Sequence, residues 1–164
     1  MYRGAEMAGR GSDMNWGLID KVVEWSAGKE AAALQNIGMT SPILDTHFPL
    51  KPIWPGVLTM SAVIRLAAGV LESAEGFARK VELSQIANVK WRKYISPGDQ
   101  LRIDVQVLSL DEAGAVVKGK VSVGNRPVAT FGEMTFRFVE GGQANRDRTK
   151  MFWQKRGYAG GGEA

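Results

Sequence analysis

The only histidine of the chain, His47, opens a segment in which prolines recur at three-residue spacing, at Pro49, Pro52 and Pro55. Gly56 follows the last proline and precedes a long apolar run. Proline fixes φ, so this backbone is stiff before any tertiary contact forms. An imidazole changes its charge near neutral pH and is therefore suited to general acid or base chemistry. The segment predicts a site in which a rigid loop carries His47 to the start of a helix.

Residues 57–73 are predicted to form that helix. Within residues 57–71 the polar side chains are only Thr59, Ser61 and Arg65. A helix that is apolar on all sides is usually buried in a core. Arg65 is unusual in such a helix, because a buried guanidinium needs a partner.

Strands are predicted on both sides of the helix. Leu101, Ile103, Val105 and Val107 alternate with polar residues, which is the two-residue period of a half-buried strand. The other predicted strands are residues 18–25, 29–35, 115–123 and 128–138, and the predicted turns are residues 111–114 and 124–127. Together these elements indicate an α+β fold, in which a curved antiparallel sheet wraps one helix. The exposed edges of such a sheet favour pairing with a second copy.

The composition limits the chemistry. The chain has 164 residues, no cysteine and one histidine, so we expect one domain without disulfides, thiol chemistry or a Cys/His zinc site. No other metal and no cofactor is expected. We find neither a secretory signal nor an apolar run of membrane-spanning length, so we expect a cytoplasmic protein with no membrane partner.

Both ends differ from the body. We expect residues 1–14 to be flexible, residues 15–139 to form the domain, and residues 140–164 to be a basic, glycine-rich tail. The tail has five basic and three acidic residues, within a chain of net charge +4. We interpret it mainly as a solvated, mobile end, although residues 151–153 are apolar enough to dock on the body. The alternatives are binding of an acidic protein or of nucleic acid, and only the charge pattern supports nucleic acid.

The segment from His47 to Leu58 resembles a central motif of the single-domain hotdog 3-hydroxyacyl-ACP dehydratases, H-F-P-G-x-P-x-x-P-G-V-L-x-x-E. The matching residues are His47, Phe48, Pro49, Pro52, Pro55, Gly56, Val57 and Leu58. Residues 18–22 resemble the first strand of that family, and residues 89–101 its basic strand with the following P-G-D-Q-L turn. The resemblance covers most of residues 15–139. It implies a hotdog domain, a curved antiparallel sheet around one long central helix, that assembles as a homodimer or as an oligomer of dimers.

The resemblance also implies roles for individual residues. His47 would be the base that removes the α-proton of a thioester, and the N–H of Gly56 would bind the thioester carbonyl at the positive end of the helix. The implied substrate pocket contains Phe48, Trp54, Pro55, Val57 and Arg65. Lys90, Arg92 and Lys93 would contact acyl carrier protein or the phosphate of a pantetheine arm, or they form an ordinary charged face.

The chain departs from the family pattern at three positions. Ser61 stands where the family has its catalytic Glu or Asp, Arg65 where Gln is usual, and Leu50 where Gly is usual. A hydroxyl is too weak an acid to protonate a leaving group near neutral pH, but it can orient water or a substrate hydroxyl. Arg65 would pair with Asp45 or a substrate carboxylate, or extend to the dimer surface.

The leading interpretation is a dehydratase-like lyase of fatty acid or polyketide metabolism. It would act on 3-hydroxyacyl thioesters of acyl carrier protein or coenzyme A, with an altered acid at Ser61. The main alternative is a non-catalytic hotdog subunit that binds acyl groups or completes a heteromer with a paralogue that keeps the acid. A minor alternative is a thioesterase in which His47 activates water.

Overall fold

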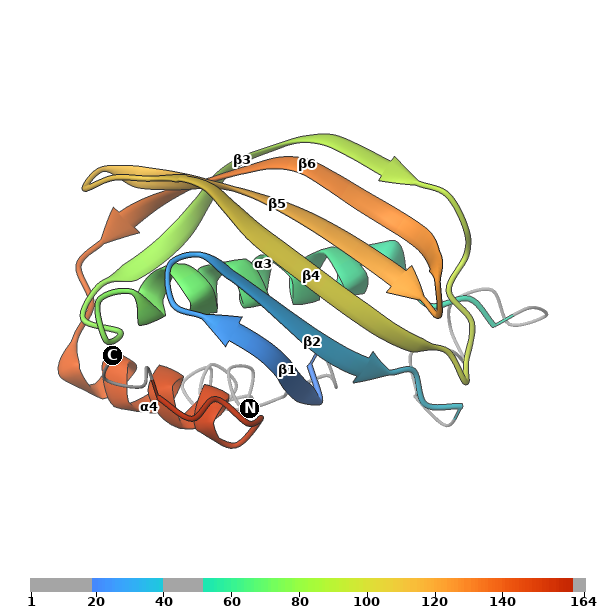
Figure 1. The fold of residues 1–164 in the computed structure, drawn as a ribbon, viewed down its shortest axis with the longest axis horizontal. Helices are drawn as coiled ribbons and strands as arrows, with labels where there is room; N and C mark the ends of the chain where they lie inside the picture. The colour runs from blue at the N-terminus through green and yellow to red at the C-terminus, as the bar shows by residue number, and fades with distance from the viewer. Residues whose placement is uncertain (1–18, 40–51, 161–164) are drawn as a thin grey trace, which may run out of the picture.

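The computed structural model describes residues 19–39 and 52–160. An antiparallel sheet arches over the central helix α3, and a second helix, α4, lies on the other side of α3 (Figure 1). The elements in chain order are β1 (Lys21–Ser26), β2 (Glu30–Asn36), α3 (Gly56–Ser73), β3 (Lys80–Trp91), β4 (Gln100–Leu110), β5 (Gly114–Val123), β6 (Arg126–Val139) and α4 (Gln143–Gln154). This arrangement confirms the predicted α+β hotdog fold.

The sheet has six strands in the order β1-β2-β4-β5-β6-β3, and every neighbouring pair is antiparallel. β4, β5 and β6 form a meander joined by the two predicted turns. In the first turn, the Asp111 carboxylate accepts hydrogen bonds from the N–H groups of Ala113 and Gly114, at 2.8 and 3.0 Å. β3 returns to pair with β6 and forms one edge of the sheet.

The core lies between α3 and the concave face of the sheet. Ala62, Val63 and Leu66 of α3 are fully buried. A Cβ added to Gly119 of β5 would lie 2.7 Å from Cγ1 of Val63, so the absence of a side chain there lets strand and helix approach closely. The core also contains Ile103, Val121, Phe131, Met134 and Phe136 from the strands.

The apolar character of α3 comes from this burial. Contrary to the expectation that no segment is long and apolar enough to span a membrane, the 18 residues Gly56–Ser73 meet that test, with a mean hydropathy of 1.4. More than half of the helix, 56%, is buried inside the protein. A buried core helix meets the same length and composition test as a membrane span, and the sheet accounts for this one.

α4 and the described residues after it, up to residue 160, pack on the body, so the interpretation as a mobile end is wrong for residues 143–160. The predicted docking of residues 151–153 is confirmed for Trp153, which is 1% exposed, whereas Met151 is 53% exposed. The Trp153 ring lies 5.1 Å from that of Trp25 between centroids, and Tyr158 lies 5.0 Å from Trp25. Burial of these aromatic rings anchors the segment despite its many glycines and charges.

The segment after α4 also reaches the edge of the sheet. The N–H of Val22 in β1 donates to the carbonyl of Arg156 at 2.7 Å. The Arg156 side chain donates through Nε to the carbonyl of Ile19 at 2.9 Å. These contacts fasten the C-terminal segment along β1.

Candidate functional site at the start of the central helix

Hydrogen bonds between distant parts of the chain fix the start of α3. The N–H of Trp54 donates to the carbonyl of Ile95 at 2.8 Å. Ile95 leads into the turn at residues 96–99, where the Asp99 carboxylate accepts a 2.9 Å hydrogen bond from the N–H of Ser96. The N–H of Gly98 in turn donates to the carbonyl of Ile37 at 2.8 Å. The P-G-D-Q-L turn therefore holds the residues before Gly56 against the sheet.

Gly56 is the first residue of α3, and its N–H has no acceptor within the helix. Pro55, the residue before it, is extended, with φ of −62° and ψ of 129°. A Cβ on Gly56 would lie 3.2 Å from the indole ring of Trp91, closer than most real contacts. Glycine thus lets the indole of Trp91 in β3 pack directly on the helix start.

A cavity of about 510 Å³ opens at this point, and we call it the Gly56 cavity. Its described lining residues are Ile53, Trp54, Gly56, Trp91, Arg92, Lys93, Tyr94 and Ile95. Four predicted site residues, Trp54, Gly56, Arg92 and Lys93, therefore meet in one cavity. Trp91 and Tyr94 also line it, although they were not among the site residues predicted from the sequence. Their signal in the sequence was the alternation of aromatic and basic residues just before the P-G-D-Q-L turn.

Other predicted site residues lie elsewhere. Lys90 is exposed on β3, and Val57 is 66% exposed; neither belongs to the described lining of the Gly56 cavity. Pro55 contributes through the backbone, since its carbonyl accepts the N–H of Leu58 at 3.1 Å. His47 and Phe48, together with Asp45, lie outside the described residues.

Trp54 brings an unusual polar group to the cavity wall. Its side chain is 5% exposed, and its Nε1–H has no hydrogen-bond partner among the described residues. A buried donor left without an acceptor costs about 1–3 kcal/mol. A ligand acceptor that reaches this N–H would remove that cost.

The hydroxyl of Ser61 is already used within the helix. Ser61 Oγ donates to the carbonyl of Val57, one turn earlier, at 2.9 Å. This backbone bond is common for serine in helices. It directs the only proton of the side chain to the backbone, so the side chain can accept a hydrogen bond but is a poor proton donor.

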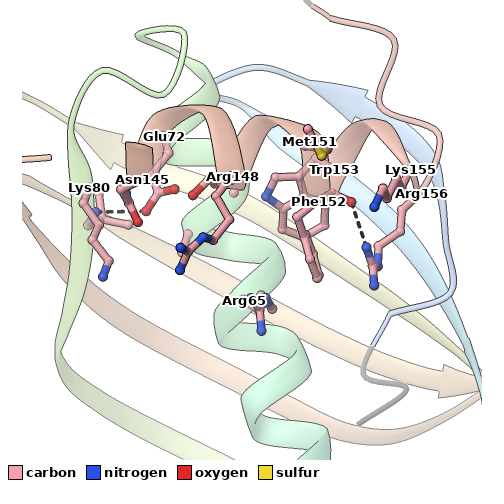
Figure 2. Close-up of a pocket in the computed structure, with 14 residues that line it drawn as sticks. Arg65, Glu72, Lys80, Asn145, Arg148, Met151, Phe152, Trp153, Lys155 and Arg156 are labelled. Carbon is pink, nitrogen blue, oxygen red and sulfur yellow. Dashed lines mark hydrogen bonds between the residues drawn. The ribbon is translucent and has the colours of Figure 1, made fainter. Parts of the chain in front are cut away.

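Arg65 extends away from the Gly56 cavity toward α4. Its guanidinium carbon lies 4.2 Å from the centroid of the Phe152 ring, a cation–π contact. Among the described residues, no carboxylate oxygen lies within 4 Å of this guanidinium. Burial lowers the pKa of Arg65, and the charge of Glu72 opposes that shift. Figure 2 shows Arg65 beneath α4, in a second cavity of about 640 Å³ that we call the Arg65 cavity.

Glu72 lies on the wall of the Arg65 cavity and is 7% exposed. Its Oε1 accepts a hydrogen bond from the N–H of Val81 at 3.1 Å. Burial raises the pKa of Glu72, against the lowering effects of the Val81 N–H and of the charges on Lys80 and Arg65. The folded chain therefore keeps this proton to a higher pH than the unfolded chain does.

This shift predicts how Glu72 affects stability at different pH values. Its contribution is fully present below the ordinary glutamate pKa of about 4.3 and is lost as the pH rises through the higher folded-state pKa. Glu72→Gln keeps an acceptor for the Val81 N–H but removes the titration. The unfolding free energy of the variant, relative to that of the natural chain, should rise between pH 4 and pH 8 in urea titrations. If the unfolding free energies of the variant and of the natural chain change in parallel with pH, the prediction is contradicted. Glu133→Gln, at an exposed position, is the matched control.

Comparisons with known proteins identify the family and the fold of this chain. Residues 12–131 match the family model described as FabA-like domain. The chain is 36% identical over 123 residues to the 3-hydroxyacyl-[acyl-carrier-protein] dehydratase FabZ of Symbiobacterium thermophilum, covering 74% of this chain and 84% of that protein.

Solved structures show the same fold. An uncharacterized protein from Pyrococcus horikoshii aligns with a TM-score of 0.61 and 17% identity, over 79% of this chain and 90% of that one. A chain of the dehydratase heterocomplex ApeI:P from Xenorhabdus doucetiae aligns with a TM-score of 0.56 and 22% identity, over 70% of this chain and 92% of that one.

Proposed function

Because the chain belongs to the FabA-like family, we propose that it is a dehydratase-like protein that binds 3-hydroxyacyl thioesters in the Gly56 cavity. The observation that carries this proposal is the helix start itself. Gly56 presents an N–H without an intrahelical acceptor, at the positive end of α3, in a cavity lined by aromatic residues. This geometry suits a carbonyl oxygen that gains negative charge during a reaction.

The proposed reaction removes water from the substrate. His47 takes the α-proton, and the electron pair moves toward the thioester carbonyl, whose oxygen accepts a hydrogen bond from the Gly56 N–H. The electrons then form the α,β double bond as the 3-hydroxyl group leaves. That group must receive a proton to depart as water, and the products are a 2-enoyl thioester and water.

The source of that last proton separates two forms of the proposal. Ser61 occupies the position of the family acid, but its hydroxyl proton is directed to the Val57 carbonyl. In one form, the chain is a slow dehydratase in which water or the imidazolium of His47 protonates the leaving group. In the other, it is a subunit of a heteromer whose paralogous hotdog chain supplies a Glu or Asp. The Ser61 bond favours the second form, and the dehydratase heterocomplex among the structural relatives is a precedent for such pairing.

The residues at the rim of the Gly56 cavity support a proposal for the carrier of the acyl group. Arg92 and Lys93 lie there beside Tyr94, which is 74% exposed. Two cations next to an exposed ring suit the phosphate and pantetheine arm of acyl carrier protein or coenzyme A. We further propose that the protein acts in the cytoplasm and that copies pair through β3, an edge strand of the described sheet.

A direct assay tests this proposal. Purified protein is incubated with a 3-hydroxyacyl thioester, and separately with the 2-enoyl thioester, on both carriers, and the products are followed by mass spectrometry. We expect interconversion of the two thioesters, and its loss in His47→Ala. Release of free thiol would replace the dehydratase proposal with thioester hydrolysis.

The same assay distinguishes the heteromer. If the isolated chain is inactive but a co-purifying hotdog protein with Glu or Asp at the position of Ser61 restores interconversion, the subunit form is correct. Absence of turnover both alone and with every such partner, across chain lengths and carriers, would overturn both forms.

A further inference from the structure

The Arg65 cavity lies between α3, α4 and the beginning of β3, separate from the described lining of the Gly56 cavity (Figure 2). Its described wall is strongly basic. The five cationic side chains are Arg65, Lys80, Arg148, Lys155 and Arg156, and the single carboxylate is Glu72. Five positive charges and one negative charge leave the wall with a formal charge of +4, which equals the net charge of the entire chain. The other 16 basic residues of the chain are matched in number by the other 16 acidic ones, so the cavity wall carries an excess of positive charge that the rest of the chain does not.

Two of these cations share one aromatic ring. The guanidinium carbons of Arg65 and Arg156 lie 4.2 and 3.6 Å from the centroid of Phe152. Arg156 is held in place by the carbonyls of Phe152 and Ile19. Burial lowers the pKa of Arg156, and the nearby charge of Arg65 lowers it further. The ring thus keeps two like charges close together in a partly dehydrated place, where they repel each other.

Three arginines elsewhere in the described chain are paired with carboxylates. Arg79, Arg102 and Arg137 each have a carboxylate oxygen within 4 Å. Among the described residues, neither Arg65 nor Arg148 has such a partner. Arg65 and Arg148 thus line the cavity without a counter-charge among the described residues, a property that they share with Arg92, Arg126 and Arg146 elsewhere.

We propose that the Arg65 cavity is a binding site for a phosphate-bearing small molecule. Its volume of about 640 Å³ lies within the range of small-ligand sites, about 300–1,000 Å³. In Figure 2 the nitrogen atoms of Lys80, Arg148 and Arg65 lie on the same side of α4. These three side chains come from β3, α4 and α3 and line one cavity, and a phosphate-bearing molecule offers several oxygens to donors from different elements.

Pyrophosphate is a suitable probe, with glutarate as the dicarboxylate for comparison. Calorimetry of the full chain at low salt should show one saturable site for pyrophosphate and at least tenfold weaker binding of glutarate. Arg65→Gln and Arg148→Gln should each weaken pyrophosphate binding about tenfold or more, because each removes a charge-assisted hydrogen bond. Lys150→Gln removes the same charge from an exposed position on α4 outside the described wall, and should change affinity less than twofold.

Arg148 is exposed, so Arg148→Gln tests the site even if Arg65→Gln impairs folding. Absence of saturable pyrophosphate binding would overturn the proposal. Equal losses in Arg148→Gln and Lys150→Gln would also overturn it, because they would indicate attraction to the general charge of α4. Glutarate binding as tightly as pyrophosphate would overturn the assignment to phosphate. None of these outcomes depends on the dehydratase assay, so the two proposals succeed or fail separately.

Discussion

Replacing Ser61 with glutamate is expected to raise the rate of 3-hydroxyacyl thioester dehydration by roughly 10²–10⁴-fold, the contribution of one well-placed acid. Under the proposed function, the substitution supplies an acid at the position where the structure has a hydroxyl bonded to Val57. Glutamate is a good helix former, and Ser61 is only partly buried, so α3 should accept the larger side chain. The measurement is the steady-state rate of interconversion of the 3-hydroxyacyl and 2-enoyl thioesters.

Two further variants show whether the gain comes from proton transfer. Ser61→Gln has nearly the same shape as the glutamate variant but no acidic proton, and it should stay at the rate of the natural chain. Adding His47→Ala to Ser61→Glu should abolish the gain, because the α-proton then has no base. An equal gain in Ser61→Gln would show that side-chain size, and not acidity, limits the reaction.

Replacing Trp153 with alanine is expected to lower the unfolding free energy by about 3–5 kcal/mol, the usual cost of removing a large buried aromatic side chain. The side chain is 1% exposed and packs against both Trp25 and Phe152. In a chain of this length, such a loss corresponds to a decrease in Tm of roughly 6–20 °C. Urea and thermal unfolding measure both quantities, and Met151→Ala, at an exposed position of α4, should change stability by less than about 0.5 kcal/mol.

The helix under Trp153 provides an independent test of the same contact. A Cβ on Gly69 would lie 2.5 Å from the Trp153 indole, so Gly69→Ala should cost about 1–3 kcal/mol through overpacking. In a chain that already carries Trp153→Ala, Gly69→Ala should no longer lower the unfolding free energy, because the indole ring that would clash with the new Cβ is absent. Simple addition of the two effects would contradict the docked position of α4.

Most of the sheet and the central helix are predictable from local patterns. The two-residue period of residues 101–107 and the apolar run after Gly56 give β4 and α3 close to their observed bounds. α4 is not predictable in this way, because its sequence is dominated by charged and polar residues. α4 is held by contacts with distant parts of the chain, such as the packing of Trp153 on Gly69 and Trp25. The absence of a side chain at Gly69 is explained only when both helices are in place.

The candidate site was predictable only in part, because some of its contacts join positions that are far apart in the sequence. Trp54 and Gly56 lie in one motif, but the hydrogen bond from Trp54 to Ile95 and the packing of Trp91 on Gly56 join positions far apart in sequence. Sequence spacing placed Arg65 one turn beyond Ser61 on the same helix. It carried no information about Phe152, which draws that guanidinium toward α4.

The hydrogen bond from Val22 to the carbonyl of Arg156 has a consequence for assembly. It places the C-terminal segment against the outer side of β1, so a second chain cannot extend the sheet there without displacing that segment. β3 forms the opposite edge of the sheet, and no other described strand pairs with its outer side. A sheet with one occupied edge and one open edge forms a closed pair and stops growing, whereas two open edges would permit an endless ribbon of chains. The C-terminal segment thus protects the β1 edge against the addition of a strand from a second chain.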